Sequence, residues 1–225
     1  KNYIDFDFDA YYTYENLDLS DQVISEMSLS ELLKAGPVYK LENMNLEDYK
    51  NALKALDVSN PYSATSYLEA LYMAGEKDDV VAATLMNEVV ADPDLAGMSL
   101  LALAPYSNLD GYATYLETLT DYIKTTLTAT GIESWGSSNS ASTATVMLGL
   151  IAQGINPQDA LYSTDDIGLV QSLMGYVDGY SFKWQLSSED VDAAFSTPQA
   201  FSALVAYKLS RDVWGFPGSN ILDFS

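Results

Sequence analysis

The chain contains no cysteine and no histidine among its 225 residues. These two residue types supply thiolate and imidazole metal ligands, thiol nucleophiles and the commonest general base near neutral pH. Their absence excludes the usual zinc sites, cysteine-dependent catalysis and histidine-based pH switching. Any chemistry must therefore use carboxylate, tyrosine, lysine or hydroxyl groups, and we expect neither a cofactor nor a bound metal.

Basic residues are also scarce. The sequence has 10 Lys and Arg residues against 32 Asp and Glu residues, a formal net charge of −22, and its single arginine is Arg211. Because phosphate backbones and anionic membrane surfaces attract clustered basic side chains, we expect no nucleic-acid partner. No apolar run approaches the roughly 20 residues that cross a bilayer, so direct membrane insertion is not expected either.

The N-terminal residues bear on the origin of the chain. The sequence begins at Lys1 without Met and shows no signal-peptide pattern. We interpret it as a mature form or as part of a longer secreted protein.

Residues 1–19 differ in pattern from the rest of the chain. Apolar and acidic residues alternate there, which is the period of an extended strand, and Asp5, Asp7 and Asp9 would share one face. That face is either a cation-binding acidic edge or the solvated side of an arm whose Ile and Phe side chains pack on the body. We therefore divide the chain into an extended acidic and aromatic arm, 1–19, and a helical domain, 20–225.

Helix signals dominate the domain. A capping residue followed by proline is typical of a helix start, and such pairs occur at Asn60-Pro61, Asp92-Pro93, Asn156-Pro157 and Thr197-Pro198. Gly75 and Gly154 suit the left-handed residue that follows a helix. The sequence predicts helices over 20–34, 46–56, 61–74, 78–90, 94–104, 112–129, 141–153, 165–176 and 198–210.

The predicted helices are of two kinds. Segments 64–74, 94–104, 142–153 and 198–207 are rich in Ala and Leu and carry almost no charge, so they must be surrounded by other helices. The segments between them, such as 78–90 and 116–124, have charged faces that suit an outer position. This alternation predicts an all-α fold of stacked helical hairpins that forms an α/α barrel or an arc of one.

Three motifs carry a resemblance to a known family. They are Ala-Leu-Ala-Pro-Tyr at 102–106, the stretch 133–157 with its Trp-Gly turn and Ser-Ala-Ser-Thr helix start, and Ser-Thr-Pro-Gln-Ala-Phe-Ser-Ala-Leu-Val-Ala-Tyr at 196–207. Over about 61–210 the chain resembles prenyltransferase/squalene-cyclase-like repeats, most closely those of surface proteins of Gram-positive bacteria. The resemblance implies a complete or partial α/α toroid of about four to five helical hairpins.

The enzymes of that superfamily depend on residues that this chain lacks. Protein prenyltransferases bind zinc through Asp, Cys and His, squalene cyclases use an Asp-x-Asp-Asp acid motif, and thioester proteins need a Cys. The acidic pairs Asp78-Asp79 and Asp165-Asp166 do not match that motif. At helix starts they would instead interact favourably with the helix dipole. Cobalamin carriers, which bind through shape and hydrogen bonds, remain compatible with the sequence.

Aromatic residues beside turns are the candidates for ligand contact. Trp135, Trp184 and Trp214 each lie next to turn residues. They could stack on a sugar or another flat ligand at the barrel rim, or they could plug the ends of the barrel. To these we add residues of the matched motifs and Tyr180, which follows Gly179. The candidate ligand-binding residues are therefore Tyr106, Trp135, Asn139, Tyr180, Trp184 and Gln199.

The sequence favours a non-enzymatic binding or interaction module, extracellular or at the cell surface. Its partner would be a carbohydrate, another small molecule or a protein at the loop rim. The alternative is a carboxylate-dependent enzyme of terpene-cyclase-like or glycan-active type, and a third interpretation is a structural spacer. A cavity with aromatic walls and a buried acid would favour the enzyme, whereas an axis filled by Leu, Met and Ala would favour the module.

The acidity predicts a dependence of stability on salt. At a net charge of −22 the folded chain repels itself, and salt or divalent cations screen that repulsion. We expect the melting temperature, followed by circular dichroism, to rise as sodium chloride increases from low to physiological concentration. A melting temperature that falls over this range would contradict the expectation.

Overall fold

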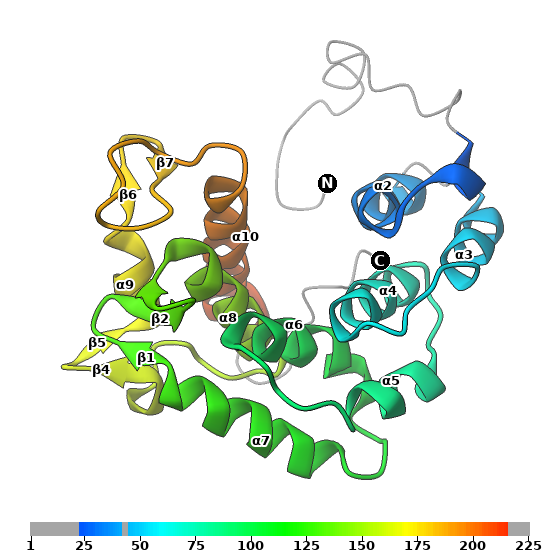
Figure 1. The fold of residues 1–225 in the computed structure, drawn as a ribbon, viewed down its shortest axis with the longest axis horizontal. Helices are drawn as coiled ribbons and strands as arrows, with labels where there is room; N and C mark the ends of the chain where they lie inside the picture. The colour runs from blue at the N-terminus through cyan, green and yellow to red at the C-terminus, as the bar shows by residue number, and fades with distance from the viewer. Residues whose placement is uncertain (1–22, 42–44, 216–225) are drawn as a thin grey trace.

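The computed structural model describes residues 23–41 and 45–215, and within them the fold is mostly helical (Figure 1). Helices α2, α4, α6, α8 and α10 pack against one another in chain order and form a continuous row. Helices α3, α5, α7 and α9 pack alongside α2, α4, α6 and α8 respectively. This packing agrees with the expected alternation of inner and outer helices for α4, α6 and α8. The expectation that segment 198–207 is enclosed is wrong, because one face of α10 is exposed, with Phe201 at 48% and Val205 at 52%.

The α-helices have the following bounds: α2 Leu29–Leu41, α3 Leu46–Lys54, α4 Pro61–Met73, α5 Asp79–Leu85, α6 Pro93–Leu103, α7 Tyr112–Thr125, α8 Ser140–Ala152, α9 Leu169–Met174 and α10 Ser196–Leu209. Short 3₁₀ turns lie at Ile24–Glu26, Ala104–Tyr106 and Ala160–Tyr162, and a π turn at Ser210–Trp214 follows α10. The predicted arm, 1–19, lies outside the described residues.

Side-chain caps define several helix starts. Asn60 and Asp92 each accept a hydrogen bond from a backbone N–H of the following turn, at 2.9 Å in both cases, with proline in the first turn. Asp78 caps α5 by accepting from two backbone N–H groups. This confirms the helix-start interpretation of Asp78. Each cap satisfies backbone donors that have no partner within the helix.

Of the four cap-proline pairs, Asn156-Pro157 does not begin a helix, and at Thr197-Pro198 a helix begins but Thr197 is not its cap. Asn156-Pro157 forms a turn, in which the Asn156 side chain accepts from the backbone N–H of Gln158 at 3.0 Å. At α10 the cap comes from Asp192, whose carboxylate accepts from the backbone N–H of Ser196 at 3.0 Å. Thr197 lies inside the first turn and uses its hydroxyl to accept from the backbone N–H of Phe182. A local cap signal thus marks a change of chain direction, and tertiary contacts decide whether a helix follows.

Three small antiparallel sheets correct the all-α expectation. They are the meander of β1 (Leu127–Thr128), β2 (Gly131–Ser134) and β3 (Ser137–Ser138), the hairpin of β4 (Ser163–Thr164) and β5 (Ile167–Gly168), and the hairpin of β6 (Val177–Asp178) and β7 (Ser181–Phe182). The registers pair Ser134 with Ser137, Thr164 with Ile167, and Asp178 with Ser181. Each strand is too short to show an alternating pattern in the sequence.

The hairpins explain two wrong helix predictions. The segment 165–176 begins with a β-turn, in which Asp165 and Asp166 have φ angles of 54° and 64°, and its helix spans only Leu169–Met174. These two aspartates therefore occupy a hairpin turn and no helix start. The predicted helix 112–129 ends at Thr125, because the chain then enters β1.

The predicted helix 20–34 is also displaced. In the described part a 3₁₀ turn occupies Ile24–Glu26, and α2 starts at Leu29 and continues through Pro37 to Leu41. Ser28 and Glu31 form reciprocal hydrogen bonds. The Ser28 backbone N–H donates to the Glu31 carboxylate at 2.8 Å, and the Glu31 backbone N–H donates to the Ser28 hydroxyl oxygen at 3.4 Å. This capping box sets the helix start at Leu29.

The closest helix pair lies at the centre of the row, where α6 and α8 meet backbone to backbone. A methyl group on Gly97 would lie 2.9 Å from the carbonyl oxygen of Thr145, and one on Gly149 would overlap the carbonyl oxygen of Gly97. Only glycine permits this distance, because a Cβ atom has no space there. Most side chains of α8 are buried as a result, and α8 is the most enclosed helix of the row.

We predict that Gly149→Ala destabilises the protein. Alanine favours a helix by about 1 kcal/mol over glycine, but its methyl group would force α6 and α8 apart, which costs about 1–3 kcal/mol or more. Chemical denaturation should therefore show a net loss of stability. The matched control is Gly175→Ala at the end of α9, where the backbone is right-handed and no neighbouring helix blocks a Cβ. A Gly149→Ala protein as stable as this control would contradict the close packing.

Candidate functional site

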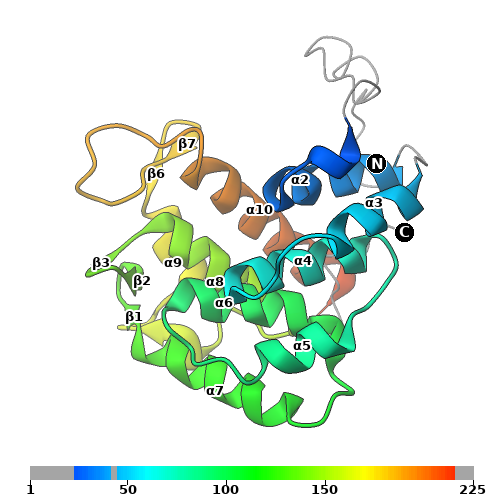
Figure 2. The ribbon, with the colours of Figure 1, turned by 45° about the vertical axis from the view of Figure 1, so that its right-hand side comes forward.

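The β2–β3 and β6–β7 hairpins lie near the N-terminal ends of α6, α8 and α10 (Figures 1 and 2). We call this region the hairpin end. It comprises residues 131–142, residues 177–185 and the first turn of α6. The hydroxyl of Ser134 in β2 donates to the carboxylate of Asp94 in α6 at 3.0 Å. The backbone N–H of Ser140 donates to the carbonyl of Trp184 at 2.9 Å. These bonds join segments about 40 residues apart in sequence.

Trp135 occupies the tip of the β2–β3 hairpin. It is 87% exposed, so it does not plug the core. Trp135 and Gly136 have φ angles of 57° and 84° and form the two-residue turn between Ser134 and Ser137, which is the type I′ geometry. Asn or Gly usually occupies the first of these positions, and a bulky residue there costs on the order of 1 kcal/mol. A large apolar side chain is thus held in water on a strained backbone.

Two further aromatic residues are exposed nearby. Tyr180 lies at the tip of the β6–β7 hairpin and is 96% exposed, and Trp184 follows β7 and is 44% exposed. The loop that carries Trp184 is fixed to the first hairpin, because the Gln185 side chain donates to the Ser137 hydroxyl. Trp135 and Trp184 therefore belong to two connected segments of the hairpin end, while Tyr180 extends from the second hairpin.

The side-chain groups of three other predicted site residues are buried. Tyr106 is completely buried near the opposite end of α6, where its hydroxyl accepts from the Asp78 backbone N–H at 3.1 Å. Asn139 is 2% exposed and caps α8 by accepting from the Ser142 N–H at 2.8 Å. Gln199 lies in the first turns of α10, and its buried side-chain oxygen has no hydrogen-bond partner among the described residues. Burial removes Tyr106 and Asn139 from any stacking surface.

Trp214 and the two acidic pairs lie in other elements of the structure. The backbone of Trp214 ends the π turn Ser210–Trp214 that follows α10. Asp78 supports α5, and Asp165 and Asp166 form the β4–β5 turn. None of these acidic pairs contributes to the hairpin end.

The partly buried carboxyl group of Asp94 is bonded to Ser134, the residue before Trp135. Burial raises the pKa of Asp94, while hydrogen bonds from Ser142 and Ser134 act in the opposite direction and the neighbouring Asp92 raises it further. Asp92 itself caps α6 and accepts a hydrogen bond from the Tyr62 hydroxyl. Sequence reasoning missed this cluster, since no local pattern connects a serine in β2 with an aspartate 40 residues earlier.

A second perturbed acid lies on α4. Burial raises the pKa of Glu69 to about 8, and within residues 23–41 and 45–215 no hydrogen bond or ion pair to its carboxyl group is found. Glu69 was not among the predicted site residues. Its surroundings on an inner helix, rather than any motif, distinguish it from the many surface carboxylates.

Neither a metal centre nor a membrane span is found in the described part of the chain. No three acidic side chains there are grouped to hold an ion. None of the described helices combines the length and the apolar character needed to cross a bilayer.

Comparison with protein-family models, with curated proteins and with solved structures gave no match. The resemblance to prenyltransferase/squalene-cyclase-like repeats therefore rests on the sequence motifs described above.

We predict that Trp135→Asn does not reduce the stability of the fold. The substitution creates the Asn-Gly dipeptide that type I′ turns favour, and relief of the strain should raise the free energy of unfolding by up to about 1 kcal/mol. Urea denaturation would measure the change, with Leu161→Asn, at an exposed position outside a turn tip, as the comparison. A marked loss of stability in Trp135→Asn would mean that the tryptophan supports the fold.

Proposed function

We propose that this protein is a non-enzymatic binding module that recognises a neutral carbohydrate at the hairpin end. The observation that carries the proposal is the exposure of Trp135 and Tyr180, at 87% and 96%, on the tips of two hairpins. Exposed aromatic rings of this size are unfavourable in water, and clusters of them mark interaction surfaces. The apolar faces of sugar rings are suitable partners for such side chains.

The scaffold supports precise presentation of these rings. Both hairpins are hydrogen-bonded to helices of the row, through Ser134 to Asp94 and through Phe182 to Thr197 at 2.9 Å. The positions of their backbones are therefore fixed before a ligand arrives. Less conformational entropy is lost on binding when a recognition loop is already ordered.

Electrostatics favour a neutral ligand over an anionic one. The chain carries a net charge of −22, and Lys183 in the second hairpin region forms an ion pair with Asp178 at 3.5 Å. An acidic polysaccharide would be repelled, and no described arginine lies in the hairpin end to pair with its carboxylates.

The binding role is favoured over the carboxylate-dependent enzyme. Asp92 is engaged as a helix cap and by Tyr62, and Asp94 accepts hydrogen bonds from Ser134 and Ser142. None of the described residues that line the pocket of about 360 Å³ between α4 and α5 is aromatic. A second space between α6, α7 and α8 has no room for a water-sized molecule.

The architecture and location form part of the same proposal. The row of inner helices flanked by outer helices suits a partial α/α toroid of the kind found in prenyltransferase/squalene-cyclase-like domains. With its acidity and its freedom from cysteine, this supports a place outside the cell or on its surface, within a larger secreted protein.

The test is a binding screen on neutral polysaccharides and oligosaccharides with the intact chain. We expect Trp135→Asn and Tyr180→Ala each to weaken binding about tenfold, since a lost aromatic anchor costs on the order of 1–2 kcal/mol. Intrinsic tryptophan fluorescence and affinity electrophoresis would report the binding.

The matched control is Val80→Ala, which removes a side chain that is 76% exposed on α5, away from the hairpins. Its affinity should equal that of the wild type. Unchanged binding in the double variant Trp135→Asn/Tyr180→Ala would reject the hairpin end as the site. Sustained turnover of a glycan would instead support the enzyme.

A further inference from the structure

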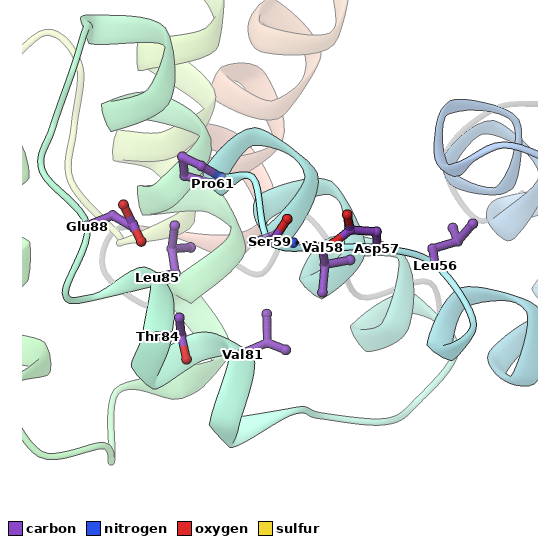
Figure 3. A pocket seen from close by; sticks show the side chains of 10 residues that line it. Leu56, Asp57, Val58, Ser59, Pro61, Val81, Thr84, Leu85 and Glu88 are labelled. Carbon is purple, nitrogen blue, oxygen red and sulfur yellow. Dashed lines mark hydrogen bonds between the residues drawn. The ribbon is translucent and has the colours of Figure 1, made fainter.

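A pocket in the outer layer is separate from the hairpin end. It has a volume of about 360 Å³ and lies between the connection from α3 to α4, the first turns of α4, and α5 with the turn that follows it (Figure 3). This volume falls in the range of small-molecule sites. Its apolar lining comes mainly from Leu56, Val58, Pro61, Val81 and Leu85.

Two carboxylates flank this apolar lining. Figure 3 shows Asp57 and Glu88 on different sides of the pocket, Asp57 before α4 and Glu88 after α5. Asp57 accepts a hydrogen bond from the Ser59 backbone N–H at 3.0 Å, and the hydrogen bonds from Ser59 lower its pKa, so it is ionised at neutral pH. Asp57 and Glu88 are both exposed.

No described cation compensates these two charges. No lysine or arginine is among the described lining residues, and no ion pair to Asp57 or Glu88 is found in the described part of the chain. The nearest lysines along the chain, Lys50 and Lys54 on α3, pair with Glu76. The pocket therefore combines an apolar lining with two uncompensated negative charges.

We propose that this pocket binds a linear aliphatic diamine. The alkyl chain would contact the apolar lining, and its two ammonium groups would lie near Asp57 and Glu88. Burying the methylene groups supplies the hydrophobic part of the affinity. The separation of the two carboxylates by an apolar surface favours a ligand with a cation at each end over one with a single charge. The net charge of −22 further raises the local concentration of cations.

The experiment uses the intact chain and three probes of equal carbon number. Hexamethylenediamine should bind most tightly, hexylamine more weakly and hexanediol least, as measured by calorimetry at low ionic strength. Increasing salt should weaken the diamine more than the other two, because its affinity depends on two partly exposed charges. Equal affinities for the diamine and the diol would overturn the proposal.

The variants assign the binding to this pocket. Asp57→Asn keeps an acceptor for the Ser59 N–H, and Glu88→Gln keeps the side-chain size, so both proteins should fold. Exposed charges contribute modestly, so each change should weaken diamine binding about 3- to 5-fold and the double change about tenfold or more. Asp110→Asn and Glu117→Gln, at exposed sites outside the pocket lining, are the matched controls.

A tethered cation gives an independent check. Thr84→Arg introduces a guanidinium group into the pocket beside Glu88 and should compete with the diamine, reducing its affinity at least as much as Glu88→Gln. If the two control variants lose as much affinity as Asp57→Asn, the diamine binds by general charge attraction and the proposal fails. Carbohydrate binding at the hairpin end is a separate readout, because none of these substitutions alters Trp135 or Tyr180.

Discussion

The structure depends on the close approach of α6 and α8 at Gly97 and Gly149. The two backbones meet this closely because a Cβ atom on either glycine would collide with the opposite helix, and this contact fixes the distance at the centre of the row. The neighbouring inner helices, α4 and α10, then pack against the free sides of the pair. A larger separation of α6 and α8 would displace the other inner helices as well, because each inner helix packs against its neighbours in the row.

The same packing explains how the hairpins are positioned. β2 lies against α8, where the Thr143 hydroxyl accepts from the Ile132 N–H at 3.0 Å, and it reaches α6 through the Ser134–Asp94 bond. The strained turn that exposes Trp135 is tolerated because β2 is anchored by these bonds and Ser137 of β3 accepts a hydrogen bond from Gln185. The stability of the helical row thus supports the unfavourable display of aromatic side chains on which the proposed recognition depends.

The two proposed sites use different physical features. The hairpin end offers aromatic rings on ordered turns and suits an uncharged ligand with apolar faces. The outer pocket offers an apolar lining with two flanking carboxylates and suits a cationic chain. A strongly acidic protein can serve both, because its charge repels anionic competitors from either site.

Local signals determined the enclosed helices α4, α6 and α8, whose uncharged, Ala- and Leu-rich composition requires burial, and the starts of α4, α5 and α6, whose caps bond to the adjacent turn. The similar composition of α10 did not determine its burial, because one of its faces is exposed. The exposed turn positions of Trp135 and Tyr180 also follow from neighbouring glycines. Tertiary contacts decided the rest. Asp192 rather than Thr197 caps α10, Asn156 begins a turn, Tyr106 is buried, and Asp94 meets Ser134, because each outcome depends on a partner that is distant in sequence or on the space that neighbouring elements leave.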